Sequence, residues 1–255
     1  MHSNINNFFL KECGLFYKTP NVRIIGGVEA VPDSWPSMAY ITLDYEYSAY
    51  LVDIDEIVNG KVSLRCAGTL IDRQTVLTAS HCVSNKTSFT YKGKTYSLNI
   101  EPNEMYPNIE STISVYLGVH DKSLVEFGEI EYPTIKRGVL KRKPHEMYDP
   151  YFTLNDIALL VLDKEVELNE HIQIACLPPD SFSYPGTNIT EAYAVGWGLI
   201  DSSGKMPDLL RNVKLTIYKS SDCHAVAVDV EKNWNSQMCA GDLKGKKAIC
   251  NGKFF

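Results

Sequence analysis

Short apolar runs separated by turn-forming residues follow one another along most of the chain. From Trp35 onward, no long stretch with a helical period interrupts them, so the first half predicts an antiparallel β-barrel. The segments that we expect to form its strands are residues 37–43, 64–71, 75–79, 114–118 and 156–162.

A second barrel is predicted from residue 193 onward. Its first strand is expected within residues 193–198 and its second within residues 209–218. In the latter, Val213, Leu215 and Ile217 alternate with polar residues, as a half-buried strand requires. The fold class is therefore all-β. The Ser-Ser-Asp run before Cys223 suits the start of a short helix.

Three stretches depart from this strand pattern. Residues 44–61 are rich in tyrosine and acid, residues 85–113 hold polar residues and prolines, and residues 136–145 gather lysine and arginine. We expect all three to be solvated loops. The alternatives are a partner-binding role for the first two and a polyanion site for the third.

The overall charge limits the class of partner. A net charge of −6 argues against nucleic acid or an anionic membrane surface, because both favour a basic surface. No apolar run reaches the length of a membrane span, the best being residues 157–162. We therefore expect neither a nucleic-acid partner nor a membrane span.

The cysteines indicate the compartment. Seven widely spaced cysteines without a Cys-x-x-Cys pair argue against a zinc site and favour disulfides in an oxidising compartment. We expect a secreted protein without metal or cofactor, even though residues 1–10 do not read as a signal peptide. Asn85 and Asn188 begin glycosylation sequons that secretion would make usable.

Two residues are candidates for acid–base chemistry. His81 lies between small residues and beside Cys82 at the end of an apolar run, a setting that suits an immobilised general base. Asp156 stands at the entrance to another apolar run, where a buried carboxylate needs a partner such as a histidine N–H. We therefore expect these two side chains to meet.

Five motifs, taken in order, resemble those of the chymotrypsin/trypsin-like family of serine endopeptidases. The resemblance covers residues 13–250 and implies two six-stranded antiparallel β-barrels. In the family a serine hydroxyl attacks the scissile carbonyl, a histidine takes its proton and an aspartate orients the histidine; His81 and Asp156 match the last two. The motifs are residues 23–27 (Arg-Ile-Ile-Gly-Gly), 66–71 (Cys-Ala-Gly-Thr-Leu-Ile), 78–82 (Thr-Ala-Ser-His-Cys), 155–162 (Asn-Asp-Ile-Ala-Leu-Leu-Val-Leu) and 196–198 (Gly-Trp-Gly).

The resemblance also implies how the chain is organised. Residues 1–23 read as a leader and residues 24–255 as the peptidase domain, activated when another protease cuts between Arg23 and Ile24. The family's partners are protein substrates and inhibitors. Its disulfide pattern implies the pairs Cys13–Cys176, Cys66–Cys82 and Cys223–Cys239, so the leader would stay tethered after cleavage while Cys250 lacks its partner.

The family's nucleophile motif is broken. Aligned on Cys250, Gly252 keeps one oxyanion-hole position, Lys253 replaces the acid that receives the new N-terminus, and Phe254 occupies the serine position. Phenylalanine cannot attack a carbonyl, and Lys253 would repel the ammonium freed at Ile24. Ala248 falls at the floor of the specificity pocket, and the last strands of the second barrel are missing.

We therefore expect no peptidase activity and consider three explanations. The favoured one is an incomplete product of an active enzyme; Gly252-Lys253-Phe254 is compatible with a GGTAAGT splice-donor sequence that was translated through. The second is a pseudoprotease that binds a partner or acts as a decoy. The third, another nucleophile such as Ser80, is disfavoured because Ser80 lies on the histidine's own segment.

Overall fold

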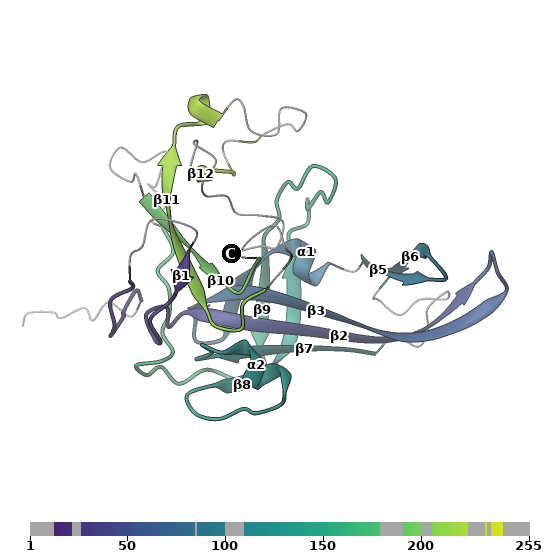
Figure 1. Ribbon diagram of the computed structural model, residues 1–255, viewed down its shortest axis with the longest axis horizontal. Helices are drawn as coiled ribbons and strands as arrows, with labels where there is room; N and C mark the ends of the chain where they lie inside the picture. Colours follow the sequence, from purple (N-terminus) through teal and green to yellow (C-terminus); the bar gives the residue numbers. More distant parts are fainter. Residues whose placement is uncertain are drawn as a thin grey trace, which may run out of the picture.

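The computed structural model describes residues 13–21, 27–84, 86–99, 110–178, 191–199, 204, 206–223, 233 and 236–241. Within them, nearly all regular structure is β (Figure 1). The elements are β1 (Val28–Glu29), β2 (Met38–Leu51), β3 (Glu56–Asp72), β4 (Thr75–Thr78), α1 (Ser80–Val83), β5 (Lys86–Tyr91), β6 (Lys94–Asn99), β7 (Glu110–Leu117), α2 (Lys122–Glu126), β8 (Ile135–Pro144), β9 (Ala158–Leu162), β10 (Glu191–Gly196), β11 (Arg211–Tyr218), the 3₁₀ helix η1 (Ser220–Cys223) and β12 (Cys239–Gly241).

The predicted first barrel is present. Strands β2, β3, β4, β9, β8 and β7 close into a barrel in that order, with antiparallel neighbours throughout. Alternate residues face its interior, and Ile41, Val115 and Leu160 are fully buried there. Within the barrel, closure leaves no open sheet edge of the kind that an unrolled sheet would have at its two ends.

The second half contributes a sheet rather than a closed barrel among the described residues. β1, β11 and β10 are hydrogen-bonded in that order, and β12 also pairs with β11. The predicted all-β fold class is confirmed, and the described sheet is consistent with a second barrel. Where the sheet meets the first barrel, Tyr40 and Trp197 pack edge to face with ring centroids 5.3 Å apart. This contact lies in a buried cluster that includes Val195 and Leu210.

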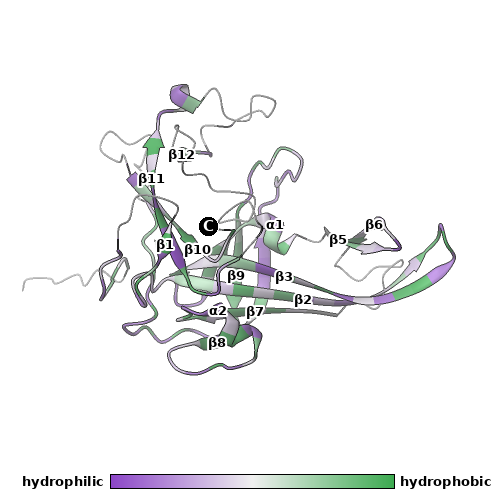
Figure 2. Ribbon diagram, viewed as in Figure 1, coloured by the Kyte–Doolittle hydropathy of each residue, from purple (hydrophilic) through white to green (hydrophobic). Residues whose placement is uncertain are grey.

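The expectation of a solvated loop over residues 44–61 was wrong. This stretch continues β2 and β3 as one long hairpin that projects beyond the barrel (Figure 1). Tyr45, Tyr47 and Ala49 are buried while the residues between them are not, so the tyrosines follow a strand period. Figure 2 shows hydrophobic and hydrophilic residues along the same hairpin.

Residues 85–113 also contain regular structure. β5 and β6 form a hairpin, and Phe89 stacks over Tyr47 of β2 with ring centroids 4.6 Å apart. At the hairpin's other end, Glu56 receives hydrogen bonds from Lys92 at 2.8 Å and Tyr91 at 3.1 Å. We refer to residues 44–63 together with β5 and β6 as the arm. In the arm, the β2–β3 hairpin and the β5–β6 hairpin pack against each other through a layer of aromatic side chains. Ion pairs lie beside this layer.

The basic stretch 136–145 is not a loop either. Most of it is β8, which pairs with β7 on one side and β9 on the other. Lys136, Lys141 and Lys143 are exposed, whereas Ile135 and Val139 pack against the barrel core. Cationic side chains on the outer face of a strand reach water without disturbing its pairing, so charge alone was a poor indicator of a loop.

The cysteine pairs implied by the family resemblance occur in the structure: Cys13–Cys176, Cys66–Cys82 and Cys223–Cys239. Gly14 N–H also donates to the Ile174 carbonyl at 2.7 Å, so the leader segment 13–21 is fixed by more than its disulfide. No helix among the described residues is long and apolar enough to cross a membrane.

Candidate active site

The antiparallel pairing of β4 with β9 brings His81 and Asp156 together. Thr78, the last residue of β4, lies opposite Ala158, the first residue of β9. His81 follows Thr78 by three residues on α1, and Asp156 precedes Ala158 by two. The Cys66–Cys82 disulfide ties α1 to β3 beside the histidine. Residues 75 positions apart in the chain therefore meet at the ends of neighbouring strands.

Asp156 holds His81 with both carboxylate oxygens. Oδ1 accepts a hydrogen bond from the His81 backbone N–H at 2.8 Å, and Oδ2 lies 2.6 Å from Nδ1 of the ring. With the carboxylate ionised, Nδ1 is the donor, which leaves the lone pair on Nε2. The His81 and Asp156 side chains are 18% and 16% exposed. This is the arrangement of a general base with an orienting carboxylate.

Ser80 is a positioning residue that sequence reasoning assessed only as a nucleophile. It is fully buried, and its Oγ donates to the Ile157 carbonyl at 2.6 Å while accepting from His145 N–H at 3.0 Å. It therefore links the histidine segment to the residues on either side of the β8–β9 connection. A small polar residue directly before the histidine was the only signal for this role in the sequence.

The backbone before Asp156 has an uncommon conformation. Thr153 and Asn155 both have a φ of 55°, a region that β-branched residues in particular avoid. The Asn155 side chain donates to the Met147 carbonyl at 2.8 Å and so fixes this turn. Nearby, burial raises the pKa of Tyr148, and the negative charge of Asp156 raises it further.

A cavity of about 790 Å³ lies on the Asp156 side of this pair, and His81 is not among its lining residues. It is large enough for side chains of a peptide, and Asp156 forms part of its wall. The other lining residues are Thr69, Leu77, Thr78, His145, Thr153, Asn155, Ile157, Ser236 and Gln237.

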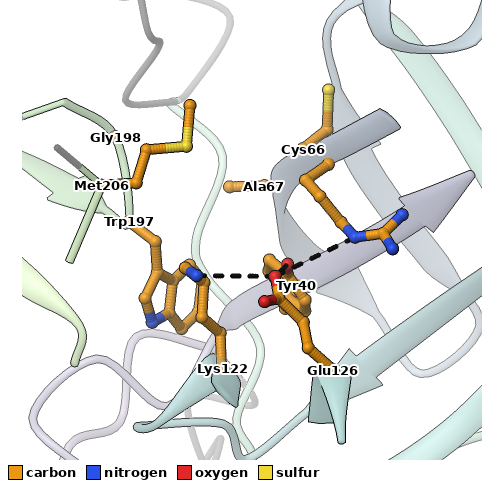
Figure 3. Close-up of a pocket in the computed structure, with 9 residues that line it drawn as sticks. Tyr40, Cys66, Ala67, Lys122, Glu126, Trp197, Gly198 and Met206 are labelled. Carbon is orange, nitrogen blue, oxygen red and sulfur yellow. Dashed lines mark hydrogen bonds and ion pairs between the residues drawn. The ribbon is translucent and has the colours of Figure 1, made fainter. Parts of the chain in front are cut away.

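A smaller cavity of about 120 Å³ lies between the barrel and the second sheet. Its lining combines the apolar residues Trp197, Met206 and Ala67 with the polar residues Tyr40, Lys122 and Glu126 (Figure 3). Glu126 accepts a hydrogen bond from Tyr40 and lies 3.5 Å from the Lys122 ammonium. Burial and the Glu126 carboxylate both raise the pKa of Tyr40, so its phenol stays protonated. The polar groups are satisfied by one another.

One cluster near the site has metal-ligand residue types. Ligand atoms of Cys66, His81 and Cys82 lie within 4.8 Å of one another, and His81 Nε2 is 3.3 Å from Cys82 Sγ. Both cysteines share a disulfide, so neither offers the thiolate that a metal requires. This cluster is therefore a disulfide beside a histidine.

Several predicted site residues lie outside the described residues. They are Arg23 and Ile24 of the cleavage site, Gly252 and Phe254 of the nucleophile region, the lone Cys250, and the sequon asparagines Asn85 and Asn188.

Comparisons with known proteins support the same family. A family model described as Trypsin matches residues 24–253. The chain is 30% identical to Proclotting enzyme of Tachypleus tridentatus, over 94% of this chain and 55% of that protein, so it spans about half of that relative's length. It is 30% identical to Granzyme B of Rattus norvegicus, over 92% of this chain and 76% of that protein. A solved structure described as "Structure of GrC" is 30% identical, covers 87% of this chain and 77% of that chain, and superposes with a TM-score of 0.59.

Proposed function

Since this chain belongs to the trypsin family of serine peptidases, we propose that it carries the general base of a secreted endopeptidase but does not itself hydrolyse peptide bonds. The observation that supports the first half is the His81–Asp156 pair, with both carboxylate oxygens engaged. The second half rests on Phe254, which stands at the aligned serine position.

The roles of Asp156, His81 and Phe254 follow from the chemistry of their side chains. Asp156 holds the imidazole in one tautomer and stabilises the imidazolium that forms when Nε2 takes a proton. In a family member the proton comes from the serine hydroxyl and is passed to the leaving amine. Phe254 has no proton to give and no oxygen to attack with, so the His81 base has no nucleophile to activate.

Activation is proposed to begin by cleavage between Arg23 and Ile24. The Cys13–Cys176 disulfide would then keep the leader on the domain until reduction. In the family the new ammonium group pairs with the acid next to the serine, whereas this chain has Lys253 there. Cleavage is therefore not expected to order an oxyanion hole at Gly252. Glycosylation at Asn85 and Asn188 is part of the same proposal of a secreted protein.

An active-site probe tests the absence of activity. The purified chain is cut after Arg23 and treated with a fluorophosphonate, with rat chymotrypsin-C as the positive control. We expect labelling of the control alone. Labelling of the cut chain would show that another residue serves as nucleophile and would overturn the proposal.

Sequencing the locus and its transcripts separates the two origins that the sequence leaves open. If the chain is an incomplete product, a downstream exon completes an Asp-Ser-Gly-Gly-Pro motif, and a longer transcript encodes an active enzyme with Cys250 paired. A stop codon with no such exon supports the alternative of a binding or decoy protein. The cavity beside Asp156 favours that alternative as a second candidate, because binding in a cavity needs no nucleophile.

A further inference from the structure

Among the described residues, one long edge of β3 has no strand partner. The strand pairs with β2 from Glu56 to Thr69, but its pairing with β4 starts only at Thr69. Between Glu56 and Ser63, in the part of the chain that the structure describes, no backbone hydrogen bond is made on the side away from β2. At the end of this run the Leu64 carbonyl accepts from the Arg65 guanidinium. An extended edge of this kind is a template for another strand.

Two of the usual protections against strand addition, proline and a β-bulge, are missing from this edge. Residues 56–63 contain no proline, and the irregularity in β3 comes later, between Leu70 and Asp72. The β5–β6 hairpin does not occupy the edge by pairing, since β5 and β6 pair only with each other. Its aromatic layer lies on the face that carries Tyr47. The opposite face of the arm, with Asn59, Lys61 and Ser63, is exposed.

The side chains beside the edge select for a particular peptide. Val58 and Val62 are half-buried on one face, and Lys61 is exposed on the other. On the β2 side, Glu46 lies 3.9 Å from Lys61, so an acid already faces this base across the β2–β3 pair. An added strand would lie on the other side of Lys61, where an acidic side chain would face the same base. Apolar side chains would face Val58 and Val62.

The direction of β3 links this edge to the candidate site. The strand runs from the far end of the arm to Cys66, whose disulfide partner Cys82 adjoins His81. A peptide paired antiparallel to β3 therefore starts at the end of the edge that leads to Cys66 and runs outward along the arm (Figure 1).

We propose that the Glu56–Ser63 edge of β3 binds an extended segment of a protein partner by β-strand addition, and that this segment alternates apolar and acidic residues. Backbone hydrogen bonds supply the affinity, and the contacts with Lys61, Val58 and Val62 supply the preference. The binding requires no nucleophile, so it stands or falls independently of peptidase activity.

The test uses a fluorescent eight-residue peptide of alternating valine and glutamate, held at nanomolar concentration and titrated with the full chain at low salt. Two further peptides carry N-methyl groups at every second residue, one in each register. Because only alternate amides of a strand point at its partner, one N-methylated peptide should lose at least about 10-fold in affinity while the other binds nearly as the parent does. Equal effects of both, or no binding of the parent peptide, would overturn the proposal.

Charge swapping checks the preference at Lys61. A valine–lysine peptide should bind about 5-fold or more weakly than the valine–glutamate peptide, and Lys61→Glu should reverse that order. The matched control is Lys141→Glu on β8, which changes the same charge at an exposed position outside the arm, where the strand pairs with β9. A reversal caused equally by both variants would show bulk charge rather than pairing at this edge.

A second copy of the chain is the competing occupant of this edge. Sedimentation should show a monomer whose mass is unaffected by the valine–glutamate peptide. A dimer that the peptide cannot dissociate, and that Lys61→Glu disrupts, would assign the edge to self-association and refute the proposal.

Discussion

Two histidine–aspartate pairs in this protein have almost the same local geometry. Nδ1 of His81 lies 2.6 Å from Asp156, and Nδ1 of His171 lies 2.8 Å from Asp33. The histidine side chains are 18% and 16% exposed, and both carboxylates are 16% exposed. Distance and burial alone therefore do not separate a catalytic pair from a structural one.

The surroundings of the two pairs differ. Asp156 uses its second oxygen to hold the backbone of its own histidine, and Asp156 lines a cavity of about 790 Å³. Asp33 uses its second oxygen to bind Lys18 of the leader, and the adjoining cavity measures only about 20 Å³. His171 also packs edge to face with Tyr132. The first pair therefore lies beside a large cavity, whereas the second connects residues 13–21 to the rest of the fold through Lys18.

Substitution of the two aspartates should separate these roles most strongly. If the locus encodes a longer product with the family's serine, Asp156→Asn in that product should lower kcat by about 10⁴-fold, because the imidazole loses its orienting carboxylate. Asp33→Asn should leave kcat within about 2-fold, since it contacts no reacting group. Steady-state kinetics on both variants provide the measurement. We refer to the contacts of Asp33 with His171 and Lys18 as the leader clamp. Similar losses of kcat for the two variants would mean that this clamp also shapes the site.

Removing the buried hydroxyl of Ser80 should have the next largest effect. Ser80→Ala leaves the His145 amide and the Ile157 carbonyl without their shared partner and should lower the free energy of unfolding by about 1–3 kcal/mol. The control is Ser63→Ala, whose exposed hydroxyl should cost less than about 0.5 kcal/mol. Denaturant unfolding compares them. Equal losses of unfolding free energy in the two variants would show that Ser80 does not help to position His81.

The sequence predicted the parts of the fold that depend on local pattern. Alternating residues in 209–218 and the apolar runs around His81 and Asp156 identified strands that the structure contains. It failed at the arm and at β8, where polar and charged residues suggested loops. Tyr47 is buried only because Phe89 lies across it, and Lys136 is exposed only because β8 turns that face outward; both facts depend on tertiary contacts.

The candidate site was predicted through its motifs, which name His81 and Asp156 but not their support. Ser80 hydrogen-bonds to residues 65 and 77 positions away, and no local pattern reveals such partners. The His171–Asp33 pair has no sequence signal at all, because its two residues are 138 positions apart and neither stands in a motif.

The leader clamp should be sensitive to acid. Burial opposes ionisation of Asp33, but hydrogen bonds from His171 and Lys18 outweigh it and hold its pKa below the usual 3.8. The ionised carboxylate therefore stabilises the fold above about pH 4, and this contribution is lost as the pH falls through the lowered pKa. Asp33→Asn should lower the free energy of unfolding by about 1 kcal/mol at pH 6 and by little at pH 2.5. A pH-independent difference would show that charge plays no part.

The smallest effect is expected from Lys18, the outer member of the clamp. Its side chain is 50% exposed, and the Asp33 hydrogen bond at 2.9 Å raises its pKa, so it stays protonated at neutral pH. Water and salt screen a pair at such a surface, so Lys18→Gln should leave the Tm unchanged at physiological salt and lower it slightly at low salt. Thermal unfolding of Lys18→Gln, Asp33→Asn and the double variant measures how the two residues are coupled. If Lys18→Gln lowers the Tm as much as Asp33→Asn does, the ion pair to the leader, and not the His171 bond, is what holds Asp33. The two histidine pairs would then differ in their strength as well as in their surroundings.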